Sequence, residues 1–582
     1  MRLRFDFANA EGVVEPLMFS APQRVIIARA ISDVAGAMDE VDRELRDGKY
    51  VAGFVSYEAA SGFESSLVTQ PPTELPLVVF GVFDAPVPAP PLTEDAAAPD
   101  IEWQSVISPA DHRRGVGTIR AAIEEGETYQ INYTFRLEAS VDPASVAPLY
   151  SSLARAERVP YGALLDLGDW KLLSLSPELF FRADFRSGRI ITQPMKGTAA
   201  RGLWLEDDDA RAEQLAKSDK NRAENVMIVD LARNDVTRVA EIGSVRATSL
   251  FHVDRYSSVL QMVSTVEGRL TPGTSLGDIF RALFPAGSIT GAPKSSSMRL
   301  IAALEHAPRG AYCGAIGFAG PGGEAVFNVA IRTVTARKDG RAEYGVGGGI
   351  TWDSEAGDEY AEALSKAACL VVRPEFELLE TLRFEGGEAV RLDKHLERLF
   401  RSAVYFGFAI DHNRVRAEVA AQLRRLRTGT LRVRIRVTRS GDAIVEHHDF
   451  GPKPADIQRI ALADSPIDRN DRFLYHKTTA RAVYDRHAAE DPDAFDVLLW
   501  NHKGELTEFT RGNLVVERQG RRLTPPRECG LLAGTFRNEL VDRGKVAEAI
   551  VTVGDLEHAS RLWFVNSLRE WVEVSRGLRR YT

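Results

Sequence analysis

The sequence predicts a multidomain protein of mixed α+β and α/β class. The chain of 582 residues is longer than one hydrophobic core supports, since domains usually hold about 100–200 residues. Amphipathic helical segments alternate with strand-like apolar runs along most of it. That pattern restarts after residue 379, where the composition changes little. We therefore expect about two to four folding units.

Composition and charge indicate a cytoplasmic protein with a small-molecule substrate. The chain is 44% hydrophobic and 27% charged, as is ordinary for a globular protein, and no apolar run approaches the roughly 18 residues of a membrane span. Arg and Asp interrupt the first residues, so no signal peptide is expected. Cys313, Cys369 and Cys529 have no metal or disulfide spacing. A net charge of −9 argues against nucleic acid or an anionic membrane as a partner.

The first 100 residues are expected to form an N-terminal sheet subdomain. An amphipathic segment near 22–46 precedes strand-like runs at 50–60 and 75–84. Residues 85–100 are rich in proline and alanine without periodicity, as in a linker. We expect a second body to begin at about residue 101.

Residues 101–372 are expected to form this second body, in which helices and strands alternate. Helices are predicted at 109–126, 143–157, 218–235 and 354–371. Strands are predicted at 129–139, 161–168, 171–184, 244–267, 310–320, 324–338 and 342–353.

A single lysine, Lys196, lies between a strand-like run and a glycine turn in ITQPMKGT (191–198). Pro194 cannot extend a central strand and Gly197 permits backbone angles closed to other residues, so Lys196 is fixed at the end of an element. A buried amine there would have a lowered pKa and could act as a nucleophile. The alternative is a structural lysine paired with a carboxylate.

Three carboxylate side chains on two predicted helices are candidate functional groups. Glu224 lies beside apolar residues of the helix at 218–235, and a carboxylate there is unfavourable unless it is paired or coordinated. Glu359 and Glu362 lie at i and i+3 of the helix at 354–371, hence on one face. The alternative for Glu224 is a surface ion pair with a nearby Arg or Lys, and the alternative for Glu359 and Glu362 is a solvated charged face.

Two glycine-rich stretches are candidate ligand contacts. The loop FPAGSITGAPK (284–294) offers free amides and Lys294, which together could bind an anion. Gly347, Gly348 and Gly349 leave a strand whose backbone a ligand can approach closely. An ordinary turn and a β-bulge are the respective alternatives.

Taken in order, these stretches resemble the chorismate-utilising family that includes anthranilate synthase component I and aminodeoxychorismate synthase component I. The resemblance covers about residues 1–372 and implies a β-sandwich with helices. Its motifs are GETYQINYT (126–134), SLSPELF (174–180), PMKGT (194–198), AENVMIVDLARND (223–235), GSITGAPK (287–294), RGAYCGAIG (309–317), AIRT (330–333) and GGGITWDSEAGDEYAEALSKA (347–367).

The resemblance implies a Mg²⁺ ion and a chorismate site. The metal-binding carboxylates of the family match Glu224 and Glu362, with Glu359 alongside, and Mg²⁺ prefers such oxygen ligands. The positions that hold the carboxylates of the substrate match Thr290, Lys294, Arg332, Gly347, Gly348 and Gly349.

Three positions favour the aminodeoxychorismate branch of the family. Water-adding members carry a base lysine where this chain has Gln130, so ammonia is the implied nucleophile. Anthranilate-type members have an alanine at the position of Lys196 and a histidine at that of Gln261. The resemblance implies that Lys196 adds to the chorismate ring, or else binds the substrate electrostatically, and that ammonia comes from a separate glutamine amidotransferase subunit or from solution.

The C-terminal part by itself predicts an α/β domain. ETLRFEGG (380–387) is followed by a predicted helix at 391–408 and by predicted strands at 429–441 and 457–464. It resembles a shortened form of the fold type IV, class IV pyridoxal phosphate enzymes, which include branched-chain and D-amino acid aminotransferases and aminodeoxychorismate lyase. The motifs are HLERL (395–399), FLYHKTTARAVYD (473–485), FDVLLWNHKGELTEFTRGNLVV (495–516) and LTPPRECGLLAGTFRNEL (523–540).

This second resemblance implies a pyridoxal phosphate site at about 377–582. Lys477 would bind the cofactor covalently, Glu508 would face the pyridine nitrogen, and Arg398 and Thr535 would hold the phosphate. Enzymes of this fold are commonly homodimers, so a homodimer through this domain is a further expectation.

Together the two resemblances imply a bifunctional enzyme that aminates chorismate and then eliminates pyruvate to give 4-aminobenzoate. One alternative is an anthranilate synthase component fused to a class IV aminotransferase. Another is a chorismate aminase whose C-terminal domain is a non-catalytic docking module.

Overall fold

The computed structural model describes residues 1–92, 99, 101–371, 375–426 and 429–576. The chain divides into two compact units. Unit 1 consists of Met1–Arg201 and Ala212–Arg373, and unit 2 consists of Gly202–Arg211 and Pro374–Thr582. The predicted boundary at residue 372 falls outside the described residues. Grouping of Gly202–Arg211 with unit 2 was not predicted from the sequence.

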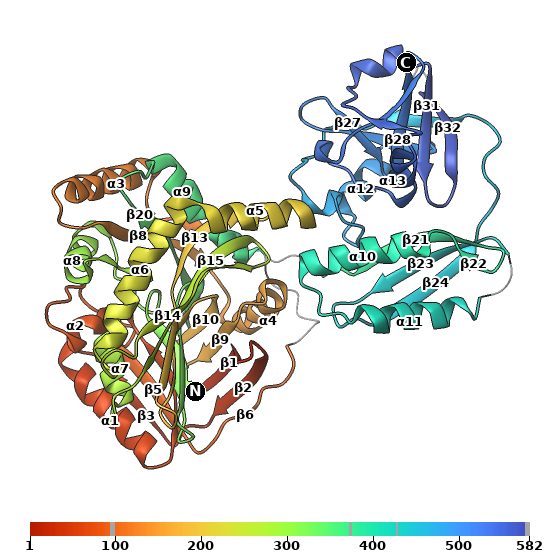
Figure 1. Ribbon diagram of the computed structural model, residues 1–582. Coiled ribbons are helices and arrows are strands. Elements are labelled where there is room, and N and C mark those ends of the chain that lie inside the picture. The colour runs from red at the N-terminus through yellow and green to blue at the C-terminus, as the bar shows by residue number, and fades with distance from the viewer. Residues whose placement is uncertain (93–98, 100, 372–374, 427–428, 577–582) are drawn as a thin grey trace. The chain divides into compact units, whose positions relative to one another are not determined.

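Unit 1 contains two large antiparallel sheets (Figure 1). The first follows the order β16 (Gly291–Ala292), β8 (Gln130–Ser140), β20 (Arg341–Ile350), β19 (Thr333–Arg337), β10 (Trp170–Ser176), β9 (Tyr161–Asp166), β1 (Arg2–Ala8), β2 (Val14–Ser20) and β6 (Val87–Pro88), with β7 (Gln104–Ser105) paired to β8. The second follows the order β13 (Met195–Ala200), β15 (Val259–Arg269), β12 (Arg189–Gln193), β11 (Leu179–Asp184), β18 (Glu324–Val329), β17 (Ala315–Ala319), β4 (Tyr50–Val55), β5 (Val78–Phe83) and β3 (Arg24–Ala28), with β14 (Arg246–Arg255) paired to β15.

The two sheets pack face to face as a sandwich. One hydrophobic cluster joins Phe5 and Leu165 of the first sheet to Phe54 and Phe318 of the second. The rings of Phe5 and Phe318 meet edge to face with centroids 5.3 Å apart. Apolar residues of facing strands thus form one shared core, as in other sheet-on-sheet packings. The β-sandwich implied by the first resemblance is confirmed.

The described residues among the first 100 do not form a sheet of their own. Strands β1, β2 and β6 extend the first sheet, whereas β3, β4 and β5 complete the second. Strand β1 pairs with β9, more than 150 residues later. Local periodicity identifies such strands but does not reveal which distant strand each one joins.

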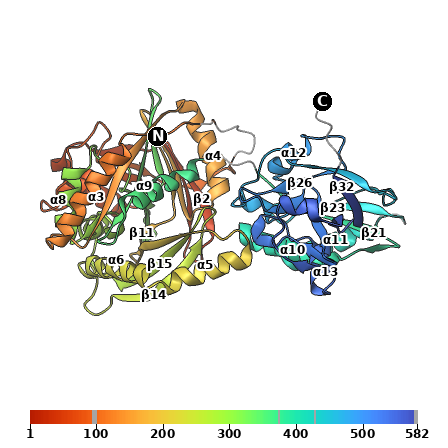
Figure 2. The same cartoon turned by 90° about the horizontal axis from the view of Figure 1, so that it is seen from above.

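Helices cover the outer faces of the sandwich. Those of unit 1 are α1 (Val34–Arg46), α2 (Ala60–Phe63), α3 (Pro109–Glu124), α4 (Val146–Glu157), α6 (Asp219–Thr237), α7 (Leu276–Leu283), α8 (Lys294–Leu304) and α9 (Ala356–Ser365). Helix α5 (Leu205–Lys217) begins within the segment grouped with unit 2. Helix α6 packs on β13 and β15, as Figure 2 shows from above.

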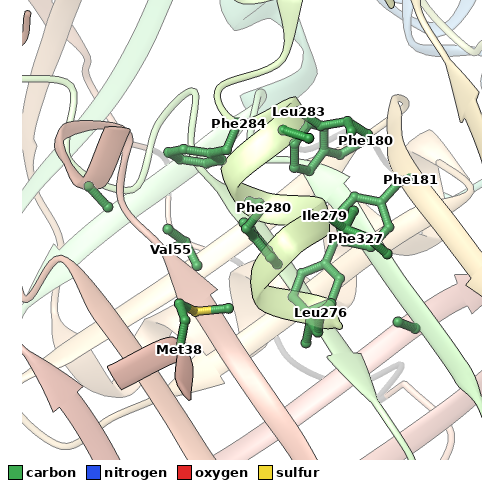
Figure 3. Packing of buried hydrophobic residues seen from close by; sticks show 14 of the residues in the cluster. Met38, Val55, Phe180, Phe181, Leu276, Ile279, Phe280, Leu283, Phe284 and Phe327 are labelled. Atoms are coloured by element: carbon green, nitrogen blue, oxygen red, sulfur yellow. The ribbon is translucent and has the colours of Figure 1, made fainter. Parts of the chain in front are cut away.

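Helix α7 is anchored by an aromatic cluster on the second sheet (Figure 3). The rings of Phe280 and Phe327 meet edge to face with centroids 5.0 Å apart. The ring centroids of Phe181 and Phe280 are 5.5 Å apart. Aromatic pairs of this geometry add about 0.5–1.5 kcal/mol each beyond the burial of their area. This packing fixes the start of the loop that runs from α7 to α8 beside one candidate site.

Unit 2 contains a four-stranded antiparallel sheet in the order β22 (Glu388–Ala389), β21 (Leu378–Glu385), β23 (Leu431–Val437) and β24 (Ala443–Asp449). Helices α10 (Leu392–Phe406) and α11 (His412–Leu423) run along one face of it (Figure 1). Leu378, Leu382, Val433 and Ile435 point into the core beneath these helices. The alternate residues of β21 and β23 therefore face the other way.

Unit 2 also contains an eight-stranded sheet. Its order is β27 (Leu506–Phe509), β26 (Asp496–Trp500), β25 (Gln458–Leu462), β32 (Glu570–Arg576), β31 (Arg561–Asn566), β28 (Gly512–Arg518), β29 (Arg521–Thr524) and β30 (Ala547–Glu548). Strand β27 also pairs with β28, which closes six of the strands into a ring. Helices α12 (Ala482–Ala488) and α13 (Thr535–Asp542) accompany this sheet. The mixed α/β class predicted for both parts of the chain is confirmed.

Candidate active sites

Lys196 lies on β13 and points across the sandwich toward β20 of the other sheet. A Cβ atom built on Gly349 of β20 would lie 2.2 Å from Lys196 Nζ and 2.5 Å from Gln130 Nε2. The structure does not show the predicted turn, because Lys196 and Gly197 both lie within β13. The pairing of β13 with β15 instead shifts register between Met195 and Thr198, and Gly197 there has a φ of +99°, a conformation that other residues rarely adopt. The glycine at 349 therefore allows the amine and the amide to meet against bare backbone.

The electrostatic surroundings of Lys196 favour a partly neutral amine. Burial lowers the pKa of Lys196 and the charge of Lys366 lowers it further, whereas Glu224, Glu362 and Glu178 oppose this shift. A lysine whose pKa is lowered can act as a nucleophile. The amine thus lies among acids contributed by α6, by α9 and by the residue just before β11.

Two more residues offer unused hydrogen-bonding groups. Gln130 begins β8 and is 1% exposed, and its Oε1 has no partner among the described residues. Arg332 adopts a positive φ of +50°, and its Nη1 is likewise buried without a partner in the described part of the chain. Its guanidinium lies 5.7 Å from the ring centre of Tyr256. Buried polar groups are normally satisfied, so both side chains are suited to bind a polar ligand.

The three glycines of β20 form a continuous bare strand. Gly347, Gly348 and Gly349 pair in register with Thr134, Tyr133 and Asn132 of β8, so the bulge considered as an alternative is not present. Strand β19 pairs with β20 only as far as Tyr344. The other edge of the glycine run is thus open to a ligand, apart from the carbonyl of Gly347, which accepts a hydrogen bond of 2.8 Å from Lys366 Nζ.

The three candidate metal-binding acids surround the same amine. Ser354 donates a hydrogen bond of 2.6 Å to Glu359, and burial together with Glu362 raises the pKa of Glu359. Lys366 lies 3.0 Å from Glu362 and lowers the pKa of Glu362 although burial opposes this. Among the described residues, no three acids or other ligands are close enough together to hold a metal by themselves.

Thr290 and Lys294 are already engaged within the protein. The Thr290 hydroxyl donates to the Ala286 carbonyl at 3.1 Å. Lys294 Nζ donates to Asp235 at 2.7 Å and to the Leu283 carbonyl at 3.1 Å. The predicted anion loop therefore has its lysine in a buried ion pair that ties α8 to α6.

Glu178, a buried acid in the motif SLSPELF, was not singled out from the sequence. It is 3% exposed, and Ser288 donates a hydrogen bond of 2.5 Å to it. Burial raises the pKa of Glu178 to about 7, although Ser288 and Lys196 lower it. A carboxyl group with this pKa can both donate and accept a proton near neutrality. In the sequence, only the preceding proline and the apolar run that follows indicate that Glu178 is buried.

A second candidate site is a cavity of about 640 Å³ in unit 2. Residues of both sheets and of three helices line it. They include Thr381, Arg398, Arg432, Arg434, Lys477, Arg481, Glu508, Thr535 and Ser567.

Lys477 has a pKa lowered to about 8, chiefly because it is buried and then because Arg481 and Arg398 are close, while Glu380 and Glu508 oppose the shift. Its carbonyl accepts a hydrogen bond of 3.0 Å from the Leu379 amide. This bond fixes the backbone of the lysine against β21.

Glu508 is held by three donors inside the cavity. The Tyr484 hydroxyl donates at 2.8 Å, the Leu532 amide at 3.0 Å and the Asn513 amide group at 3.3 Å. Burial nevertheless raises the pKa of Glu508 to about 8. A fixed acid of this kind can share a proton with a ring nitrogen.

Arg398 is oriented by Glu380, which was not singled out from the sequence. Two parallel hydrogen bonds of 2.8 and 2.7 Å join the guanidinium to this carboxylate. Glu380 also contacts His395 Nδ1 at 2.6 Å. Arg398 and His395 lower the pKa of Glu380 to about 2 although burial opposes this. The pair keeps Arg398 rigid, and bidentate pairs of this kind are strong.

The start of α13 lies at the same end of the cavity. Thr535 is its first residue, after Gly534, and its hydroxyl lies 3.2 Å from His395 Nε2. Ser567 contacts the same ring nitrogen at 2.8 Å. Free amides at a helix start attract phosphate. The residues that would hold a phosphorylated cofactor, namely Lys477, Glu508, Arg398 and Thr535, thus line one cavity and fit pyridoxal phosphate.

Comparisons with known proteins agree with this two-part organisation. Residues 17–372 match the family of chorismate binding enzymes, and residues 377–576 match the class IV aminotransferases. The chain belongs to the chorismate binding enzymes. It also carries a class IV domain, which implies pyridoxal phosphate as a cofactor.

Individual relatives match the first part of the chain. Aminodeoxychorismate synthase of Streptomyces griseus is 45% identical over 266 residues, which are 46% of this chain and 36% of that protein. Aminodeoxychorismate synthase component 1 of Salmonella typhimurium is 41% identical over 264 residues, which are 45% and 57% of the two chains. The chain thus spans about a third to three fifths of the length of these relatives.

A solved structure, anthranilate synthase component I from Streptococcus pneumoniae, has a TM-score of 0.54 and 26% identity to this chain. It covers 64% of this chain, which covers 92% of it. In the described residues no helix is both long and apolar enough to span a bilayer.

Proposed function

We propose that this protein makes 4-aminobenzoate in two steps, amination of chorismate to 4-amino-4-deoxychorismate in unit 1 and removal of pyruvate in unit 2. The observation that carries the proposal is the placement of Lys196, a buried amine with a lowered pKa, beside Gln130 and among three acids. The similarity to two aminodeoxychorismate synthases supports the first step. The class IV match supports the second.

In the first step Lys196 would attack the chorismate ring. A C–N bond forms as the C–O bond of the ring hydroxyl breaks, and Glu178 gives its proton so that the hydroxyl leaves as water. The carboxylate of Glu178 then takes back the proton released from the new amine. Ammonia, bound by Gln130, then forms a C–N bond to the ring as the C–N bond to Lys196 breaks. Glu178 gives its proton to the leaving lysine nitrogen and takes one from the added ammonia, which restores the free lysine. A purely electrostatic role of Lys196 is the alternative for this step.

Arg332 and the open edge of Gly347–Gly349 would hold the carboxylates of chorismate. The Arg332 guanidinium has a buried Nη1 without a partner among the described residues, and a planar guanidinium suits bidentate carboxylate binding. We assign Thr290 and Lys294 to shaping the loop at this site, since both are bonded within the protein.

Glu224, Glu359 and Glu362 would hold Mg²⁺. Mg²⁺ usually binds one or two protein carboxylates and completes its shell with water and substrate oxygens, so this partial set fits. The ion would supply a Lewis acid for the leaving hydroxyl and the ring carboxylate of chorismate.

In the second step pyridoxal phosphate supplies an electron sink. Lys477 would attach it and then move the proton at the carbon that bears the substrate amine, a task suited to a pKa of about 8. Glu508 would hold the proton of the pyridine nitrogen. Arg398, Thr535 and the start of α13 would bind the phosphate.

The main competing function is an anthranilate synthase joined to an aminotransferase. Lys196 and Gln261 argue against it. Gln261 Nε2 donates to the Gly197 carbonyl at 2.9 Å, and the Thr198 hydroxyl donates to Gln261 Oε1 at 2.9 Å. Gln261 therefore holds the part of β13 that follows Lys196 in place, and its amide is no proton donor for pyruvate loss.

The test is to incubate the purified protein with chorismate, an ammonium salt, Mg²⁺ and pyridoxal phosphate and to identify the products by mass. 4-Aminobenzoate with pyruvate is expected. Anthranilate would contradict the role of Lys196. Accumulated 4-amino-4-deoxychorismate would contradict the second step, and an absorption band of bound pyridoxal phosphate would then separate an aminotransferase from a docking module.

We further propose that a separate glutamine amidotransferase supplies the ammonia and that the protein forms a homodimer through unit 2. Size-exclusion chromatography with light scattering tests the dimer. Glutamine-dependent product formation on adding an amidotransferase subunit tests the ammonia source.

A further inference from the structure

The cavity of unit 2 has a second group of cations, away from the lysine. Four arginines lie on one face of the adjacent strands β21 and β23, because Arg383 pairs with Arg432 while Arg434 and Arg436 follow on the same side. This face is opposite to the apolar one that packs under α10 and α11. Thr381, opposite Arg434, lines the cavity together with Arg432 and Arg434.

Two of these four arginines are neutralised by acids. Arg383 binds Glu570 at 3.2 Å and Glu385 at 3.1 Å. Arg436 binds Glu377 at 3.2 Å and Glu446 at 3.1 Å. Neither Arg383 nor Arg436 lines the cavity.

The other two arginines are the ones that line the cavity. Arg432 and Arg434 make no ion pair within 4.0 Å with any acid in the described part of the chain, and Arg432 Nε is buried without a hydrogen-bond partner there. Glu446 lies opposite Arg434 on β24 but is paired with Arg436. Unpaired guanidinium groups inside a cavity favour an anionic ligand.

The position of these groups suits a substrate with its carboxylate far from its amine. Leu379 is bonded to the backbone of Lys477, and residues on one face of a strand follow at roughly 6.5–7 Å intervals. Thr381 is one such spacing along β21 from Leu379, and Arg434 lies opposite Thr381. Arg432 lies opposite Arg383, which is two such spacings from Leu379. In 4-amino-4-deoxychorismate the ring carboxylate is on the opposite side of the ring from the amine.

We infer that Arg432 and Arg434 bind the ring carboxylate of this cyclic amino acid and so select it over α-amino acids, whose carboxylate is one carbon from the amine. The inference rests on the proposed lyase function and assigns its substrate specificity. These arginines are not required to bind the cofactor phosphate, because Arg398, Thr535 and the start of α13 would bind it at another part of the cavity.

The experiment uses the full-length protein loaded with pyridoxal phosphate and the variants Arg432→Gln and Arg434→Gln. Arg436→Gln is the matched control, since Arg436 is on the same face of the same strand but outside the cavity. With 4-amino-4-deoxychorismate as substrate, KM is expected to rise about tenfold to a hundredfold in the first two variants, because charge-assisted hydrogen bonds are the strong ones. KM of the control should stay within about twofold, as for a side chain that does not touch the ligand.

A second measurement does not depend on turnover. 4-Aminobenzoate, which keeps the ring carboxylate, is titrated while the absorption band of bound pyridoxal phosphate is followed, so that only the unit 2 site is observed. Its Kd should rise in Arg432→Gln and Arg434→Gln and not in Arg436→Gln, with cofactor affinity unchanged in all three.

Wild-type affinity for 4-aminobenzoate in both cavity variants would overturn the inference. An equal loss of affinity in Arg436→Gln would also overturn it, and so would an absorption band of the wild-type protein that does not change when 4-aminobenzoate is added. Failure of the lyase function is separate. In that case the wild-type protein releases no pyruvate from 4-amino-4-deoxychorismate, while the titration still decides whether the arginines bind the carboxylate.

Discussion

The lysines of the two candidate sites, Lys196 and Lys477, are both buried amines with a lowered pKa, but their neighbours differ in charge. Acids from α6, from α9 and from the residue just before β11 oppose the shift at Lys196. Arginines add to the shift at Lys477, whose pKa falls to about 8. Burial alone therefore does not set the chemistry of a lysine. The charges placed around it decide how much of the amine is neutral and which groups can take its proton.

The strongest way to separate the two sites is to remove each lysine. Lys196→Ala should abolish amination of chorismate, and Lys477→Ala should leave amination intact but lower 4-aminobenzoate release by about 10³-fold, the scale of a lost acid–base group. Chorismate consumption and pyruvate release, measured in the same reaction, check both. Normal amination by Lys196→Ala would contradict its covalent role.

Removing the acid beside the first lysine should have the next largest effect. Glu178→Gln keeps a hydrogen-bonding partner for Ser288 but cannot transfer a proton, so kcat for amination should fall about 10²–10³-fold with little change in KM for chorismate. Steady-state kinetics with an ammonium salt measure both. A rise in KM alone would show that Glu178 only positions the substrate.

The pH dependence of cofactor attachment tests the charge environment of Lys477. Because only the neutral amine of Lys477 attacks the cofactor aldehyde, attachment to the cofactor-free protein should speed up about tenfold per pH unit below pH 8 and level off above it. Stopped-flow absorbance from pH 6.5 to 9.5 follows this step. Arg481→Gln removes a cation and should move the midpoint to higher pH, whereas an unchanged midpoint would contradict the electrostatic explanation.

The smallest effect on turnover is expected at Lys294. Lys294→Met leaves Asp235 buried without its cation, and breaking such a pair lowers the free energy of unfolding by about 3–5 kcal/mol. KM for chorismate, measured on the folded protein, should stay near the wild-type value. Arg332→Gln is the contrasting variant and should raise KM. An elevated KM without lost stability in Lys294→Met would instead make Lys294 a substrate ligand.

Much of the local structure could be predicted from the sequence alone. Helix α6 and strands β8, β10, β20 and β23 lie where the apolar periodicity predicts them, because burial on one face imposes that period. Pro194 does interrupt the chain between β12 and β13, but the turn predicted after Lys196 is a register shift inside β13, where Gly197 has a positive φ. The separation into a chorismate-binding part and a class IV part also followed from ordered motifs.

Which side chains meet depends instead on how distant parts of the chain pack together. Local patterns do not show that β1 pairs with β9, that Glu178 faces Lys196, or that Lys294 is bonded to Asp235. Local patterns also place Arg432, Arg434 and Arg436 alike on one face of β23. The structure shows that Arg436 is neutralised by acids, whereas Arg432 and Arg434 line a cavity. Charge pairing and burial depend on contacts between residues far apart in the chain, and these contacts set the pKa of a group and its availability to a ligand.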